Sequence, residues 1–440
     1  METYLIIEEK KLSIQRKFMY SFGFILFSMM IVTPSAYQIH KAVLIFVIFW
    51  GILIDLLINK KRRLYPLISQ LFVFYILLGL TYGIYGYFRQ NLGAIPITKE
   101  TVLYVILYMI LICGLVDYTS IKYIHKTLVF SMSFLCLYFL ASILNAYGIW
   151  PDWIYFNLQT ETSEDSINTD AIELYGRFSA SFSSFPGLLF LQPYLFSYII
   201  TNPGQKSKLM WILFIAMTVI MVFAGRRILM IVALTFPLII VVVLSILNKP
   251  IALKTIRWRS VILYSVFVIS GLGFIIIKIS GLNIQSSIEY FLFTFQAQQI
   301  TSGGQVITNV RLETIHHLFN GWKESPIFGF GNGASYSKYI RSDTQPWSYE
   351  VQYMQFIYSW GVFGCMLYGL GIFYIIKKLI KIYKENTVFS TYAISSLMGM
   401  VAFLIGNATN PYLLKIDSLY IIFLPVAIIN LYYLTPKTLS

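Results

Sequence analysis

Long apolar runs, separated by short charged or turn-forming segments, make up most of the chain. A helix needs about 20 apolar residues to cross the roughly 30 Å of hydrocarbon in a bilayer. Runs of this length, bounded by charges and turn signals, predict about twelve membrane-spanning helices. They lie at about 18–36, 41–58, 66–88, 100–116, 127–147, 183–201, 209–224, 228–247, 260–280, 351–376, 389–406 and 417–434. The pattern therefore predicts an all-α polytopic integral membrane protein with a single membrane domain over residues 1–440.

Two longer polar segments interrupt the apolar runs, at about 148–182 and 281–350. The first contains the acidic, Ser/Thr-rich run 161–166, whose composition is typical of a solvated loop. In the second, apolar residues recur at helical spacing, at Leu312, Ile315, Phe319 and Trp322. This spacing predicts an amphipathic helix at about 309–322, which we expect to lie along the membrane surface.

The composition supports a membrane protein, because 58% of the residues are hydrophobic and 12% are charged, against about 25% charged residues in soluble domains. The net charge of +14 could indicate a nucleic-acid-binding protein. However, the basic residues gather in alternate connections, such as 60–63 and 377–384, which is the positive-inside pattern of membrane proteins. The pattern places both termini in the cytoplasm and both long polar segments outside, and no nucleic-acid partner is expected.

The sequence indicates neither a metal site nor a nucleotide site. The three cysteines lie in apolar runs without CxxC or Cys/His spacing, and no HExxH, DxD or Walker sequence is present. The glycine-rich run 329–333 follows Ser325 and Pro326 rather than a predicted strand, which argues against a phosphate loop. We expect a tight, irregular turn back toward the membrane, in which glycine permits positive φ and close backbone approach. No metal and no other cofactor is expected.

Arg226 and Arg227 lie between two apolar runs at the predicted outer boundary of the membrane, where basic residues are not expected. Their side chains could extend to lipid phosphates. Alternatively, the planar and permanently charged guanidinium groups could bind a substrate diphosphate through paired hydrogen bonds. The residues alone leave both interpretations open.

Arg311 begins the predicted amphipathic helix, and Glu313 and His317 share a face of that helix away from its apolar stripe. These three side chains could form part of a functional site or an ordinary surface network. His316 falls beside the apolar stripe, which predicts a packed histidine rather than a ligand.

The order of these motifs resembles the O-antigen polymerase (Wzy-type) and O-antigen ligase superfamily of polytopic membrane glycosyltransferases. In that family a late external loop carries an arginine that opens a helix. A Pro-x-x-Gly-x-Gly turn and a span beginning near Gly-x-x-Gly follow it. Arg311, 326–331 and 361–364 match these features in turn. The run 224–227, Ala-Gly-Arg-Arg, is similar to the family's arginine signature at the outer end of a helix, and 176–179 is similar to the segment before the preceding span.

One position departs from the family pattern. Many members, ligases especially, have a histidine eleven residues before the first glycine of Gly-x-x-Gly, and this chain has Glu350 there. Glutamate can also accept a proton, so a role as general base is retained on chemical grounds. The difference favours the polymerase branch over the ligase branch.

The resemblance implies a GT-C-like membrane enzyme that builds O-antigen, as part of lipopolysaccharide, or capsular polysaccharide. Such an enzyme transfers glycan from an undecaprenyl-diphosphate carrier to the non-reducing end of another carrier-linked repeat, at the outer (periplasmic) face of the bacterial inner membrane. Its partners would be the carrier-linked oligosaccharide, the lipid bilayer, a chain-length regulator and a flippase. The catalytic candidates are Arg226, Arg311 and Glu350, because displacement at an anomeric carbon needs a stabilised diphosphate and a base for the acceptor hydroxyl. The candidates for substrate binding are Arg177, Arg227, His317 and Arg341.

Two alternatives remain. A ligase would transfer the finished polymer to the lipid A core. A polysaccharide flippase or other transporter would carry ionisable residues at mid-membrane and paired repeats with broken helices, and the sequence shows its charges mainly at span ends and no evident inverted repeat.

Overall fold

The structure is a computed structural model of the 440-residue chain. It describes residues 14–34, 36–59, 63–146, 166–168, 179–181, 184–202, 208–223, 227–247, 301–302, 305–306, 310–340, 342–385, 387–409 and 411–435.

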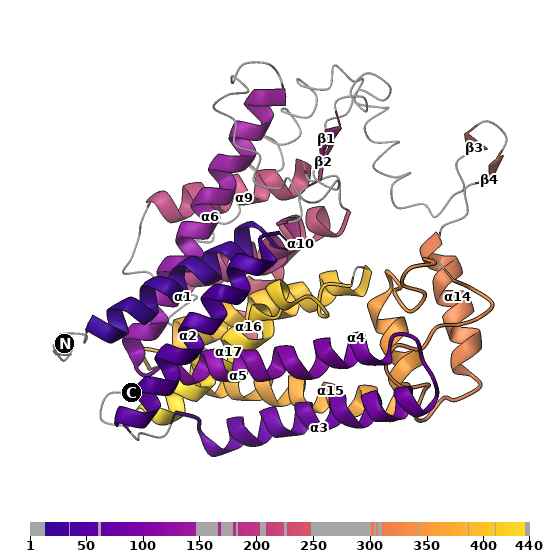
Figure 1. The fold of residues 1–440 in the computed structure, drawn as a ribbon. Helices are drawn as coiled ribbons and strands as arrows, with labels where there is room; N and C mark the ends of the chain where they lie inside the picture. The colour runs from indigo at the N-terminus through magenta and orange to yellow at the C-terminus, as the bar shows by residue number, and fades with distance from the viewer. Residues whose placement is uncertain are drawn as a thin grey trace.

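Helices account for most of these residues (Figure 1). In chain order they are α1 (Ile14–Val32), α2 (Gln38–Asn59), α3 (Pro66–Phe88), α4 (Ala94–Thr98), the π-helix η1 (Lys99–Leu103), α5 (Tyr104–Cys113), α6 (Tyr118–Ala146), α8 (Phe185–Thr201), α9 (Lys208–Phe223), α10 (Arg227–Ile246), α14 (Val310–Trp322), α15 (Gln352–Lys384), α16 (Ser390–Gly406), the 3-10 turns η2 (Asn407–Thr409) and η3 (Ile416–Ser418), and α17 (Tyr420–Leu434). Two small antiparallel ladders lie in the long polar segments. They pair β1 (Ser166–Asn168) with β2 (Ser179–Ser181), and β3 (Thr301–Ser302) with β4 (Gln305–Val306).

A helix occupies every predicted span except 260–280, which lies outside the described residues. The fourth span begins earlier than its prediction of about 100, because α4, η1 and α5 form one continuous apolar segment, Ala94–Cys113. Pro96 near the start of that segment does not end it, since the first turn of a helix has no intrahelical N–H bond to lose.

The described helices confirm a polytopic membrane protein. Six are long and apolar enough to cross a bilayer: Gln38–Ile58, Pro66–Phe88, Ala94–Cys113, Tyr118–Ser142, Ile228–Ile246 and Gln352–Lys384. Shorter apolar helices include Phe185–Thr201, Ser390–Gly406 and Tyr420–Leu434. A helix of 17 residues, such as α8, is about 26 Å long, close to the thickness of the hydrocarbon.

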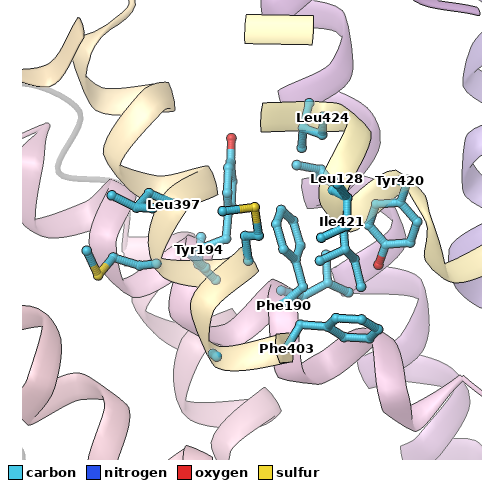
Figure 2. Close-up of a cluster of buried hydrophobic side chains, with 14 of the residues drawn as sticks. Leu128, Phe190, Tyr194, Leu397, Phe403, Tyr420, Ile421 and Leu424 are labelled. Atoms are coloured by element: carbon cyan, nitrogen blue, oxygen red, sulfur yellow. The ribbon is translucent and has the colours of Figure 1, made fainter. Parts of the chain in front are cut away.

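The main hydrophobic core lies around α8, which is buried along nearly its whole length. Side chains from α6, α8, α16 and α17 meet there, and Figure 2 shows Phe190 and Tyr194 of α8 among their neighbours. Small residues let α16 approach closely, because a Cβ on Gly399 would lie 2.6 Å from the Phe190 ring and one on Gly406 would lie 2.4 Å from Leu189.

Two buried ion pairs lie near the ends of α2. Lys41 near the start of α2 lies 3.1 Å from Asp417 in η3, and both side chains are 3% exposed. Near the other end of α2, Asp55 pairs with Arg63 just before α3. Removing one member of such a pair leaves a buried charge and costs about 3–5 kcal/mol, so these pairs fix how the connections between helices are packed.

Candidate active site

The candidate site is built on the glycine-rich turn 329–333, where the backbone at three positions requires glycine. Gly329, Gly331 and Gly333 have φ angles of 65°, 86° and 68°, which L-residues rarely adopt. Close contacts add to this requirement. A Cβ on Gly331 would lie 2.5 Å from the Gly86 backbone of α3, and one on Gly333 would lie 1.8 Å from the Gly93 backbone. The expected irregular turn with positive φ and close backbone approach is therefore confirmed.

The turn is inserted into a kink of α15, so the two glycine motifs form one structure. Gly361 has φ 61° inside α15 and interrupts its hydrogen-bond ladder. The N–H groups of Val362 and Phe363 donate instead to Pro326 O and Ile327 O, both at 3.0 Å. The freed carbonyl of Ser359 accepts from Phe330 N at 3.0 Å and Gly331 N at 2.7 Å. A kink in a membrane helix needs such substitute partners, because lipid offers none.

Asn332 anchors the turn to three helices and is fully buried. Its backbone N–H donates to Tyr82 O of α3 at 2.9 Å, and its amide donates to Thr98 Oγ1 of α4 at 3.1 Å. The indole of Trp360 in α15 donates to its carbonyl oxygen at 2.6 Å. This structural role of Asn332 was not predicted from the sequence. An asparagine among glycines was the only available signal, since its partners lie far away in the chain.

Arg311 near the start of α14 and Glu350 in the loop before α15 form an ion pair. Arg311 Nε donates to Glu350 Oε2 at 3.0 Å across 39 positions of sequence. Figure 1 shows α14 standing across the ends of α3 and α15, and α14 is held there by its buried residues Thr314 and Leu318. The Arg311 and Glu350 side chains are 47% and 34% exposed, so solvent or a substrate can reach the pair.

Tyr349 fixes the backbone next to Glu350. Its buried hydroxyl accepts from Tyr336 N at 2.9 Å and donates to Tyr339 O at 3.3 Å. Burial raises the pKa of this hydroxyl above its usual value, so it remains a neutral donor at physiological pH. The end of the loop that carries Glu350 is thereby tied to an earlier part of the same loop, at Tyr336 and Tyr339.

The histidines of α14 differ in their surroundings. His317 Nε2 lies 3.9 Å from Glu313 Oε1, and its ring stacks on Tyr339 with centroids 4.6 Å apart. His316 is exposed and contacts Asn320 at 3.3 Å, so the prediction of a packed His316 is wrong. The reason is that the described protein leaves the adjacent apolar stripe uncovered: Leu312 is 53% and Phe319 43% exposed.

The remaining predicted site residues cannot be compared with this pair. Arg177, Arg226 and Arg341 lie outside the described residues, and of Arg227 only its position as the first residue of α10 is described. Arg311, Glu350 and His317 are the predicted site residues whose side chains are described, and they lie on one unit formed by α14 and the loop that follows it.

Arg89 is a further cation near the glycine turn, and it was not predicted from the sequence. It follows the last residue of α3, and its guanidinium carbon lies 5.0 Å from the centroid of the Tyr85 ring and 5.1 Å from that of Phe330 in the glycine turn. Such cation–π contacts hold a guanidinium in place while leaving its N–H donors available. In the sequence Arg89 is an ordinary charge at a helix end, and only the fold brings it to the turn.

The site offers guanidinium groups, a carboxylate and aromatic rings. Among the described residues no three or more His, Cys, Asp or Glu side chains cluster in a way that could hold a metal ion. These groups can bind an anionic phosphate, accept a proton from a hydroxyl, and pack against the apolar faces of a sugar.

Comparison with known proteins finds a family that part of the chain resembles. Residues 212–369 match the family model described as O-antigen ligase. A search of curated proteins gives no match. The matched region runs from α9 into α15 and includes Arg226, Arg311, Glu350 and both glycine motifs. The resemblance to the O-antigen polymerase and ligase superfamily, expected from the sequence, is therefore confirmed for residues 212–369.

Proposed function

We propose that the protein polymerises polysaccharide repeat units carried on undecaprenyl diphosphate at the outer face of the bacterial inner membrane. The observation that carries the proposal is the ion pair between Arg311 and Glu350, which puts a diphosphate ligand and a general base on one exposed surface. Both residues lie within the segment that matches the O-antigen ligase family.

In the proposed reaction, an acceptor hydroxyl at the non-reducing end of one repeat attacks the anomeric carbon of another. A new C–O glycosidic bond forms, the bond between the anomeric carbon and the diphosphate oxygen breaks, and Glu350 takes the hydroxyl proton. The departing undecaprenyl diphosphate carries the electron pair of the broken bond. Arg311 and Arg226 stabilise this negative charge, which is the role of a preorganised cation in the transition state. The carrier linkage supplies the energy, so no nucleotide is needed.

The ion pair implies an order of events. While Arg311 donates to Glu350 at 3.0 Å, one oxygen of the carboxylate is occupied by this hydrogen bond. A diphosphate is a stronger competitor for guanidinium, because it offers more negative charge and bidentate geometry. Binding of the carrier-linked glycan therefore draws Arg311 away from Glu350. The carboxylate is then free to accept the proton of the acceptor hydroxyl.

The choice between polymerase and ligase rests on Glu350, which stands where many ligases of the resembled family have histidine. The family model that matches is itself described as O-antigen ligase, so transfer of polymer to the lipid A core is the second candidate. A gel of lipopolysaccharide or capsule from a deletion strain distinguishes them. A single repeat left on the anchor supports the polymerase, whereas unligated polymer that accumulates on the carrier would identify a ligase.

We expect the reaction to be metal-independent, because arginines rather than a divalent cation would bind the diphosphate. Purified protein should polymerise carrier-linked repeats at the same rate with excess EDTA and without it. If EDTA abolished polymerisation and Mg²⁺ or Mn²⁺ restored it, the leaving group would need a metal and this account of the arginines would be wrong.

A further inference from the structure

An apolar groove with a volume of about 480 Å³ lies between α3 and α15. One wall is formed by Phe74, Leu77 and Leu78 of α3, and the opposite wall by Leu367 of α15. The polar atoms along it are already bonded within the protein, since Thr81 Oγ1 donates to Leu77 O and Tyr82 OH donates to Trp360 O, both at 2.8 Å. The groove therefore suits a hydrocarbon chain.

The glycine motifs supply the end of the groove that faces the candidate active site. Phe328 belongs to the Pro-x-x-Gly-x-Gly turn and Phe363 to the Gly-x-x-Gly motif, and both line the groove. Their ring centroids are 5.6 Å apart. They meet because the turn is inserted into the kink at Gly361. The same backbone contacts that hold the candidate active site thus close one end of the groove.

A cation lies at that end. Tyr85 lines the groove, donates to Gly329 O at 3.3 Å, and carries the guanidinium of Arg89 over its ring at 5.0 Å. Arg89 is exposed, and among the described residues it forms no ion pair. Its donors are thus available to an anion at the end of the groove, where an amphiphile whose chain fills the groove would place its head group.

We propose that this groove holds the first part of the polyprenyl chain of the carrier and that Arg89 binds the carrier's phosphate. The identity of the lipid rests on the function proposed above, whereas the need for an apolar chain bearing a phosphate rests on the groove and Arg89 alone. In the groove, the chain packs between Phe74, Leu367 and the Phe328–Phe363 pair. The diphosphate then lies at the glycine turn, within the unit that also carries Arg311.

A second groove on α3 offers an internal comparison. It lies against α4, is lined by residues that include Leu80, Ile84 and Ile95, and has Lys99 beside it. Neither glycine motif contributes to it. We assign no carrier to this groove, because it lacks both contact with the turn and a guanidinium.

Binding to purified protein tests the assignment without relying on polymerisation. Native mass spectrometry would compare undecaprenyl phosphate, undecaprenyl diphosphate and phosphatidylglycerol as probes. Leu367→Trp should fill the groove and Arg89→Ala should remove the anion ligand, each weakening binding of the undecaprenyl lipids about tenfold or more. The controls are Leu370→Trp, on the exposed side of the same helix, and Lys99→Ala in the second groove, and both should bind as the wild type does.

Each outcome decides the proposal. Equal weakening by Leu367→Trp and Leu370→Trp, or none by Arg89→Ala, would overturn it. Binding of phosphatidylglycerol as tightly as the undecaprenyl lipids would make the groove a site for ordinary bilayer lipid and would also overturn it. A ligase would still need a carrier lipid, so these binding results and the lipopolysaccharide gel can fail independently.

Discussion

At the scale of single residues, the pair of Arg311 and Glu350 adds little to stability. Both side chains are a third to a half exposed, and exposed ion pairs typically contribute about 0–1 kcal/mol. The pair can therefore be altered without loss of the fold, and the effects of substitution on activity can be separated from effects on stability.

Glu350 is tested by two substitutions with different chemistry. Glu350→Gln keeps the shape but removes the proton acceptor, so we expect only the single-repeat product and a melting temperature close to that of the wild type. Glu350→His restores a proton acceptor and should retain part of the polymer length. Gel analysis of the polysaccharide and thermal unfolding in detergent measure the two effects. Normal polymer from Glu350→Gln would remove Glu350 from the role of base.

Substitution with lysine tests whether the arginines act through their geometry. Lysine keeps the positive charge but loses the planar arrangement of paired N–H donors. If Arg226 and Arg311 bind the diphosphate through paired donors, Arg→Lys should be nearly as harmful as Arg→Ala, with a rate defect of about 10²–10³-fold. Polymer length would be measured for each variant, with membrane abundance checked by immunoblot.

Arg227 serves as the matched control for this test. If the Arg227 guanidinium extends to lipid phosphates rather than to the diphosphate, Arg227→Lys should have a mild effect, because lysine can make the same contact. A severe defect from Arg227→Lys would show that Arg227, rather than Arg226, binds the diphosphate. Wild-type chain length from Arg226→Lys and Arg311→Lys would show that positive charge alone is enough.

At the scale of elements, the kink of α15 determines where the site lies. Because Gly361 breaks the helix, the glycine turn and the residues just before it, from Pro326, can enter the helix and satisfy its free backbone groups. The turn then carries Asn332 into the space between α3, α4 and α15. The loop that continues to Glu350 therefore begins from a fixed position.

Two glycines of α15 provide a matched comparison. At Gly361, alanine would require φ 61° and place its Cβ 2.2 Å from Ile327 O, so strain of roughly 1–3 kcal/mol or more is expected. At Gly369 nothing lies within 4 Å of the added Cβ, and alanine should be neutral or stabilise the helix by up to about 1 kcal/mol. Thermal stability by fluorescence-detected size-exclusion chromatography should fall for Gly361→Ala and not for Gly369→Ala. Equal stability of the two variants would show that the kink is not required.

The exposed stripe of α14 is the second feature at this scale. Leu312, Ile315 and Phe319 remain exposed although the helix packs on the other side through Thr314 and Leu318. An amphipathic helix at the end of membrane spans can place such a stripe in the interface of the bilayer. We propose that orientation for α14, which would keep Arg311 at the depth of lipid phosphates.

At the scale of the whole molecule, sidedness decides whether the proposed reaction is possible. The carrier-linked repeats are expected at the outer face, so the glycine turn must lie outside. The basic residues at 60–63, before α3, and at 377–384, in the last turns of α15, predict that these ends of the two helices lie in the cytoplasm.

Reporter fusions test this topology directly. Fusions after Arg63 and after Lys384 should report the cytoplasm, and a fusion near Asn332 should report the exterior. A cytoplasmic signal near Asn332 would overturn both the topology and the proposed outer-face reaction, because the site and its donor would lie on different sides of the membrane.

Features that depend on local pattern could be predicted from the sequence. Apolar runs predicted the described spans, helical spacing at Leu312 and Ile315 predicted the stripe of α14, and repeated glycine at 329–333 predicted positive φ. These features need only the periodicity of a helix and the conformational freedom of one residue type, which are encoded within a few positions.

Which distant residues meet could be seen only from the tertiary structure. It paired Arg311 with Glu350, placed Arg89 over Phe330, and bonded Asn332 to Trp360. His316 is exposed in the structure, although its position beside the apolar stripe predicted that it would be packed. Whether protein covers a helix face depends on the neighbouring elements rather than on the sequence of that helix. Such contacts arise only when the kink at Gly361 admits the turn and the helices have packed around it. They depend on the three-dimensional position of the whole backbone, which local pattern does not contain.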